Sequence, residues 1–185
     1  MTQSPPTGIE KELTFTRFDR MSVQYPELPA VVFLGETFSY RRLRDLSERF
    51  AGALADMGIA RGDRVMVYIA NSVQWVIAFL GIQRIGAVIV PVSPIYTSHE
   101  ITYMIRDGGV QAVVCSDTNF GYVREALAQA VAEVMAGCRY TTTPSHTSKG
   151  GAYHCLNVET TVESEPARLD LYDRLRRHPA VLMVL

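Results

Sequence analysis

Cysteine is scarce in this chain: three in 185 residues, too few and too scattered for a disulfide framework. An excess of charge of one sign is also lacking, because eighteen basic side chains are balanced by nineteen acidic ones and the formal net charge is -1. Such a surface offers nucleic acid or an anionic membrane no electrostatic footprint. The sequence therefore predicts neither partner, and its cysteine usage favours a reducing cytoplasm.

Long hydrophobic runs are missing as well. Residues 1–12 are polar, carry two prolines, and lack the apolar core of a secretory signal. The most apolar stretch, 75–82, is bounded by Gln74 and Gln83 and is far shorter than the ~20 residues that a membrane span needs. We therefore expect neither export nor a membrane span, and the 48% of apolar residues can form a globular core.

Strand and helix patterns begin near residue 30. The runs 30–34 and 37–40 flank Gly35 and predict an N-terminal hairpin. From Tyr40 onward, apolar residues recur at steps of three or four, which predicts an amphipathic helix capped by Ser39 and ended by Gly58.

The following segment alternates between buried strands and helices. The pattern predicts a strand over 64–70 that is buried on both faces, a core helix over 72–85 and a further strand over 87–92. Further on, it predicts a helix from Thr97 or Ser98 to Asp107, a strand over 110–115 and a helix over 122–135. This alternation predicts the α/β class, with a mostly parallel sheet and flanking helices.

The amino-acid composition changes after Ala136. We divide the chain into an N-terminal extension (1–26), an α/β subdomain (27–136), an irregular polar loop (137–168) and a truncated helix and strand (169–185). The polar stretch has few large aliphatic residues and no periodicity, which indicates either a mobile loop or a segment foreign to the fold. Residues 169–177 predict a short helix, and 180–185 a strand.

Three local patterns have plain structural interpretations. Trp75 and Phe79 lie four residues apart on the predicted core helix and are interpreted as packing. The turn after the strand over 64–70 has no glycines, which argues against a dinucleotide-binding Rossmann domain. A third pattern is a group of cysteines and histidines that lacks the paired spacing of zinc ligands and is interpreted as part of a solvated loop. Its members are Cys138, His146, His154 and Cys155.

Four motifs follow one another in a distinctive order. They are Arg61-Gly62-Asp63-Arg64-Val65, then Asn71, then Ile85-Gly86-Ala87-Val88, then Pro91-Val92-Ser93-Pro94-Ile95-Tyr96-Thr97. In this order and spacing, over about residues 30–128, the chain resembles the AMP-forming acyl-CoA synthetases. The stretch 93–97, with Glu100 beyond it, looks most like the branch acting on medium- and long-chain fatty acids.

The resemblance implies the N-terminal subdomain of the adenylate-forming enzyme fold. The complete family enzyme joins a fatty acid to AMP and passes the acyl group to CoA, so ATP, Mg²⁺ and CoA are implied as its cofactors and partners. Gly62, Gly86 and Asn71 are interpreted as scaffold residues. Ligands of open α/β sheets bind beyond the carboxyl ends of strands, so the loop with Ser93, Tyr96 and Thr97 is the candidate for contact with acyl or CoA groups. No catalytic or metal-binding residue is assigned.

The family also needs a phosphate loop rich in Ser, Thr and Gly that ends in Lys. The segment Tyr140–Gly150 has a similar composition, but Thr143 and His146 stand where glycines are needed and Pro144 removes an amide donor. In the family, an apolar strand like 179–185 runs into that loop. We therefore expect a truncated synthetase that is inactive alone; the alternative is a non-catalytic interaction module or a degenerate gene product. A stable, monodisperse chain favours the module.

Overall fold

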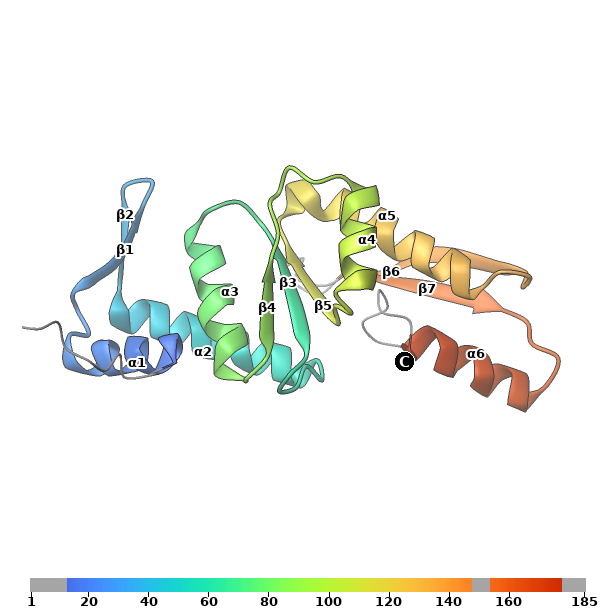
Figure 1. Ribbon diagram of the computed structural model, residues 1–185, viewed down its shortest axis with the longest axis horizontal. Coiled ribbons are helices and arrows are strands. Elements are labelled where there is room, and N and C mark those ends of the chain that lie inside the picture. Colours follow the sequence, from blue (N-terminus) through green and yellow to red (C-terminus); the bar gives the residue numbers. More distant parts are fainter. Residues whose placement is uncertain (1–12, 148–153, 178–185) are drawn as a thin grey trace, which may run out of the picture. The chain divides into compact units, whose positions relative to one another are not determined.

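The computed structural model describes residues 13–147 and 154–177 (Figure 1). The chain divides into two compact units. The first unit consists of residues 13–95 and 112–119, and the second of residues 96–111 and 120–177. Each unit is described by itself.

A three-stranded parallel sheet forms the centre of the first unit. β3 (Arg64–Tyr68) lies between β4 (Val88–Pro91) and β5 (Ala112–Cys115), and it pairs with both in parallel. The four residues from Val65 to Tyr68 are 0% exposed, so β3 is buried on both faces as the sequence predicted. The predicted parallel α/β fold is thereby confirmed.

Two helices cover one face of this sheet. α2 (Tyr40–Asp56) and α3 (Val73–Arg84) begin at Ser39 and Ser72, whose hydroxyls accept hydrogen bonds from backbone amides of the first helical turn, each at 3.3 Å. Their buried side chains join those of the sheet in one apolar cluster that includes Leu54, Val65, Val67, Ala78 and Ile82. Both helices therefore match their predicted positions within two residues.

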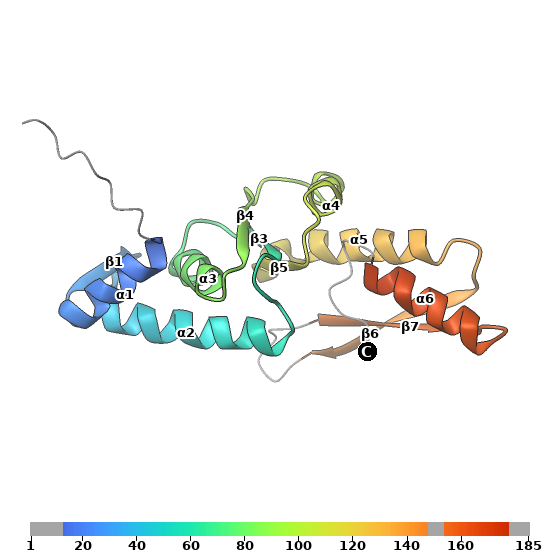
Figure 2. The ribbon, with the colours of Figure 1, turned by 60° about the horizontal axis from the view of Figure 1, so that its bottom comes forward.

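α2 and α3 approach each other closely at a glycine. A Cβ on Gly81 would lie 2.8 Å from Cδ1 of Phe50 and 2.9 Å from the carbonyl oxygen of Ser47. Only a residue without a side chain fits this crossing, which Figure 2 shows from the side. Trp75 and Phe79 on α3 stack with ring centroids 5.4 Å apart, and Trp75 packs against the core cluster, so the packing interpretation is confirmed.

The N-terminal hairpin is present, and a helix precedes it. β1 (Pro29–Phe33) pairs antiparallel with β2 (Glu36–Ser39), as predicted. α1 (Thr14–Gln24) was not predicted, because residues 1–26 were assigned to an N-terminal extension. Asp19 on α1 accepts hydrogen bonds from both terminal nitrogens of Arg84 on α3, one of them 2.7 Å long, and this pairing ties α1 to the first unit.

The second unit contains helices and a hairpin. α4 (Ser98–Asp107) matches the prediction. α5 (Asp117–Val134) begins five residues before its predicted start, and its first residues belong to the first unit. α6 (Glu165–Arg177) begins four residues before its predicted start. One apolar cluster brings α5 and α6 together with the hairpin: Val131, Val134, Met135, Leu171 and Leu175 at its centre, with Tyr140 and Val158 against them.

The prediction of irregular structure over 137–168 is wrong for the described part of that stretch. β6 (Tyr140–Thr147) and β7 (His154–Thr160) pair antiparallel. β-branched threonines supply strand propensity there, yet Thr141, Thr142 and Thr143 are all exposed, so no alternation of apolar and polar residues marks the strand. The strand predicted over 180–185 lies outside the described residues. Within the described residues, no helix is long and apolar enough to cross a membrane.

Candidate functional site

The carboxyl ends of the three parallel strands form one polar edge. Asn71 and Ser72 follow β3, Ser93 follows β4 with one residue between them, and Ser116 directly follows β5. Because parallel strands end at the same edge, this edge is where open α/β sheets bind their ligands. We therefore take it as the candidate site of the first unit.

Asn119 is the buried polar residue of this edge, with 7% of its surface exposed. Its side-chain amide donates a hydrogen bond of 3.1 Å to the carbonyl oxygen of Pro94, and its amide oxygen accepts one of 2.8 Å from the Ser116 hydroxyl. These bonds connect the loop that follows β4 with the start of α5. Sequence reasoning missed both Ser116 and Asn119, although their position directly after an apolar strand was a usable signal.

The structure distributes the three predicted loop residues over both units. Ser93 is exposed at the end of β4 in the first unit, whereas Tyr96, half-buried, and Thr97, exposed, belong to the second. The Thr97 hydroxyl and its backbone amide both donate hydrogen bonds of 2.9 Å to the Glu100 carboxylate. Thr97 is thus a helix-capping residue, as the sequence also predicted, and its role toward a ligand stays a prediction.

The same contacts shift the titration of Glu100. The backbone amide of Thr97, followed by its hydroxyl, stabilises the carboxylate and lowers the pKa of Glu100. A carboxylate at this position completes the capping box and complements the positive end of the α4 dipole. The start of α4 therefore already holds an anion of its own chain.

Cys115, the last residue of β5, carries a thiol at the candidate edge. Burial, together with the negative charge of Asp117, raises the pKa of the Cys115 thiol to about 11. A thiol with this pKa stays protonated at neutral pH and is a poor nucleophile. The edge thus contains polar binding groups and no activated sulfur nucleophile.

The described residues do not fit the phosphates of ATP or a metal ion. The segment that resembles a phosphate loop is a strand over its described part, with Tyr140 to Pro144 in register with Thr160 to Leu156 of β7. Its backbone is engaged in a β-ladder, whereas a phosphate cradle needs amides that converge on one point. Among the described residues, no group of three or more His, Cys, Asp or Glu side chains could hold a metal ion. The interpretation of Cys138, His146, His154 and Cys155 as part of a solvated loop stays a prediction.

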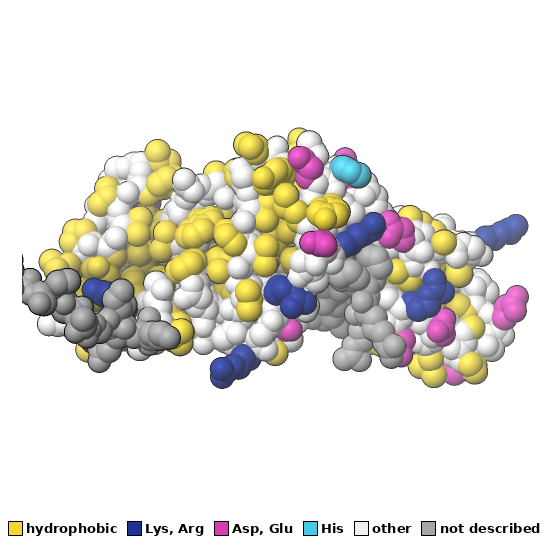
Figure 3. All heavy atoms as spheres, viewed as in Figure 1, with side chains coloured by type: hydrophobic (Ala, Val, Ile, Leu, Met, Phe, Trp, Pro, Cys, Tyr) yellow, Lys and Arg dark blue, Asp and Glu magenta, His cyan; other side chains and the backbone are white. Residues whose placement is uncertain are grey.

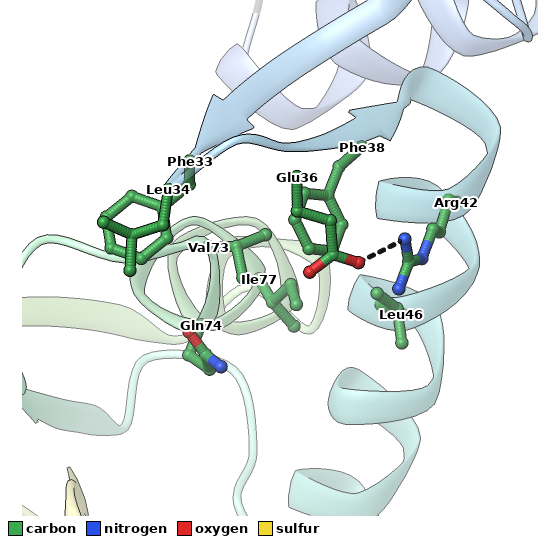
Figure 4. A pocket seen from close by; sticks show the side chains of 9 residues that line it. All are labelled: Phe33, Leu34, Glu36, Phe38, Arg42, Leu46, Val73, Gln74 and Ile77. Atoms are coloured by element: carbon green, nitrogen blue, oxygen red, sulfur yellow. Dashed lines mark hydrogen bonds and ion pairs between the residues drawn. The ribbon is translucent and has the colours of Figure 1, made fainter.

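A concave feature lies beside the β1–β2 hairpin and is called the hairpin groove here. It has a volume of about 480 Å³ and opens between the hairpin and the helices α2 and α3 (Figure 4). Its apolar lining consists of Phe33, Leu34, Phe38, Leu46, Val73 and Ile77. At the edge of the groove, Arg42 donates a hydrogen bond of 2.8 Å to the Glu36 carboxylate, and its guanidinium lies 4.3 Å from the centre of the Phe38 ring.

The fold is that of the N-terminal domain of adenylate-forming enzymes. A Mycobacterium tuberculosis fatty acyl CoA synthetase superposes with a TM-score of 0.57 at 26% identity, over 60% of this chain and 22% of that one. The Klebsiella oxytoca NpsA N-terminal subdomain, solved in complex with anthranilyl-AMSN, gives a TM-score of 0.54 at 27% identity, over 57% of this chain and 27% of that one.

Sequence comparison agrees with the fold. The family model described as AMP-binding enzyme matches residues 18–179, and the chain belongs to this family. The chain is 33% identical over 113 residues to a long-chain-fatty-acid–CoA ligase of Salmonella typhimurium, a match that covers 60% of this chain and 20% of the relative. The chain therefore spans about a fifth of the length of the curated relatives it matches.

Proposed function

We propose that this chain is the N-terminal scaffold of a fatty-acid–CoA ligase. The complete enzyme would activate a fatty acid with ATP and Mg²⁺, release pyrophosphate and pass the acyl group to CoA in the cytoplasm. The observation that carries the proposal is the family match over 18–179, together with relatives that act on long-chain fatty acids by name. ATP, Mg²⁺ and CoA come from the family and not from any site in the described residues.

The 185 residues are proposed to be inactive by themselves. The segment whose composition comes closest to a phosphate loop is paired in a hairpin over its described part, which supports this proposal. The role that we propose for this chain in the complete enzyme is structural. The carboxyl edge of the sheet would face the acyl or CoA group, with Ser93 exposed at that edge and Tyr96 and Thr97 following it in the loop. Asn119 holds the loop after β4 through its bond to Pro94.

Two assays test this proposal. Purified chain, incubated with ATP, Mg²⁺, CoA and a long-chain fatty acid, is expected to release no pyrophosphate above a blank without acid. A hybrid in which this chain replaces the matched stretch of the Salmonella typhimurium ligase is expected to regain activity. The same hybrid carrying Ser93→Ala is expected to raise KM for acid or CoA more than it lowers kcat. Release by the chain alone, or a folded hybrid without activity, would contradict the proposal.

A further inference from the structure

Helix α1 has few features that would stabilise it by itself. It has 11 residues, and isolated helices of this length are marginal in water. The N-cap residue, Leu13, makes no side-chain capping hydrogen bond, and α1 has no acidic residue in its first turn and no basic residue in its last. Ser22 is the one buried residue of α1, and its hydroxyl donates to the carbonyl oxygen of Asp19 in the same helix. α1 therefore depends on its contacts with the rest of the first unit.

An aromatic ring and an ion pair connect α1 with its neighbours. Phe18 packs against the apolar cluster around Phe38, and its ring centroid lies 5.4 Å from that of Tyr40. α3 is an apolar helix whose only charged residue is Arg84, and Figure 3 shows hydrophobic side chains gathered over it. The Arg84 guanidinium donates to both carboxylate oxygens of Asp19, and the two side chains are only 18% and 26% exposed. Such a shielded, bidentate pair holds α1 more strongly than a surface pair would.

A second carboxylate competes with Asp19 for this guanidinium. Oε1 of Glu48 on α2 lies 3.5 Å from Nη1 of Arg84, and it accepts a hydrogen bond of 2.8 Å from Nε of Arg44. Nε of Arg84 is buried and has no hydrogen-bond partner among the described residues. When α1 docks, Asp19 approaches Glu48 and the two negative charges repel each other. When α1 leaves, Glu48 remains beside Arg84 and can pair with it.

We propose that α1 opens as a unit while the sheet of the first unit stays folded, and that Arg84 then changes its partner from Asp19 to Glu48. A helix with weak ends and little buried surface is the kind of element that opens locally. The change of partner makes the opening less costly, because the guanidinium at the end of an apolar helix is never left without a carboxylate. This movement goes beyond the proposed ligase function and does not depend on it.

Hydrogen–deuterium exchange resolved by segment tests the movement in the 185-residue chain. Amides of residues 14–24 should exchange faster than those of β3 and more slowly than those of an unprotected peptide, because α1 opens without the sheet. R84M removes the guanidinium and D19N the negative charge, and each should speed exchange in α1 about 30-fold while β3 changes less than about twofold. A common rate for α1 and β3, an unprotected α1, or variants that leave α1 unchanged or speed both segments equally would overturn the proposal.

Two further variants separate the change of partner from a general loss of charge. E48Q should slow exchange in α1 about threefold, because the open state loses its ion pair and the closed state loses a repulsion. An unchanged or faster E48Q would contradict the change of partner. R41M is the matched control, since the pair between Arg41 and Glu27 is 2.8 Å long but its side chains are 60% and 74% exposed. It should alter exchange in α1 less than about twofold, and an R41M variant as fast as R84M would contradict the special role of Arg84.

Discussion

The two units of this chain differ in how their cores are built. In the first unit, β3 is buried on both faces and helices α2 and α3 pack against it, so that its elements show either a continuous apolar run, as in β3, or an apolar stripe, as in α2. In the second unit, five buried residues from α5, its end and α6 make up the cluster, and the hairpin adds partly buried side chains such as Tyr140 and Val158. The core of the first unit is therefore easier to predict from the sequence, and we expect it to be the more stable of the two.

Removing one buried side chain from each core tests this difference most strongly. Ile82 is 0% exposed in the first unit, and Ile82→Ala should lower the free energy of unfolding by about 3 kcal/mol. Leu171 is 7% exposed in the second unit, and Leu171→Ala should cost about 2 kcal/mol. Hydrogen exchange resolved by segment should show each loss confined mainly to its own unit. Equal losses of protection in both units after either change would show that they fold as one.

The close approach of α2 and α3 gives the next largest effect. Gly81→Ala should destabilise the first unit by about 2 kcal/mol, because the new methyl group meets the Ser47 carbonyl oxygen at 2.9 Å and the backbone there cannot yield easily. Gly52→Ala on α2 is the matched control. No atom lies within 4 Å of its new Cβ, so the gain in helix propensity should stabilise the chain by about 0.5–1 kcal/mol. Urea denaturation gives the free energy of unfolding of both variants. Changes of the same sign in the two variants would contradict the described crossing of α2 and α3.

These contrasts also explain how much of the molecule the sequence could predict. The parallel strands, α2, α3 and α4 were predicted within a few residues, because buried positions, caps and glycine turns all indicated the same boundaries. α1 and the β6–β7 hairpin were not predicted. α1 has an amphipathic pattern of its own, with Phe18 packed against the apolar cluster of Phe38, Leu43 and Val73, and this signal was missed. The strand β6 exposes three consecutive threonines and leaves no local pattern.

The candidate site shows the same limit. The rule for parallel sheets singled out the loop after β4 as the candidate for ligand contact; Ser93 is exposed at that edge, and its contact with a ligand stays a prediction. The position of Asn119 after β5 was a usable signal, but its bonding partner, the carbonyl oxygen of Pro94, lies 25 residues away and could not be predicted. Long-range polar contacts of this kind are decided by tertiary structure, whereas caps such as Thr97 and Glu100 are decided within one turn and were predicted.

Asn119→Asp is the third prediction and tests the polar edge of the first unit. Aspartate has nearly the same shape and can still accept from Ser116, but its carboxylate cannot donate to the Pro94 carbonyl oxygen. We expect a loss of about 1 kcal/mol and faster hydrogen exchange in residues 93–97. Ser116→Ala keeps the bond to Pro94 and should instead loosen the start of α5. Loops that exchange equally fast in both variants would show that Asn119 does not hold this segment.

The smallest effect is expected at the start of α4, in the second unit. The pKa of Glu100 is lowered in the folded chain, first by the Thr97 amide and then by its hydroxyl. Its contribution to stability is therefore complete above the ordinary carboxyl pKa of 4.5 and disappears as the pH falls through the lowered value. Glu100→Gln should thus melt slightly earlier than the natural chain at neutral pH, and the difference should vanish in acid. Thr97→Val removes the weaker of the two donors, so its pH profile should lie between those of the natural chain and E100Q. If the melting curves of E100Q and the natural chain differed equally at all pH values, the ionised carboxylate would have no part in capping α4, and the side chain would act there through its shape alone.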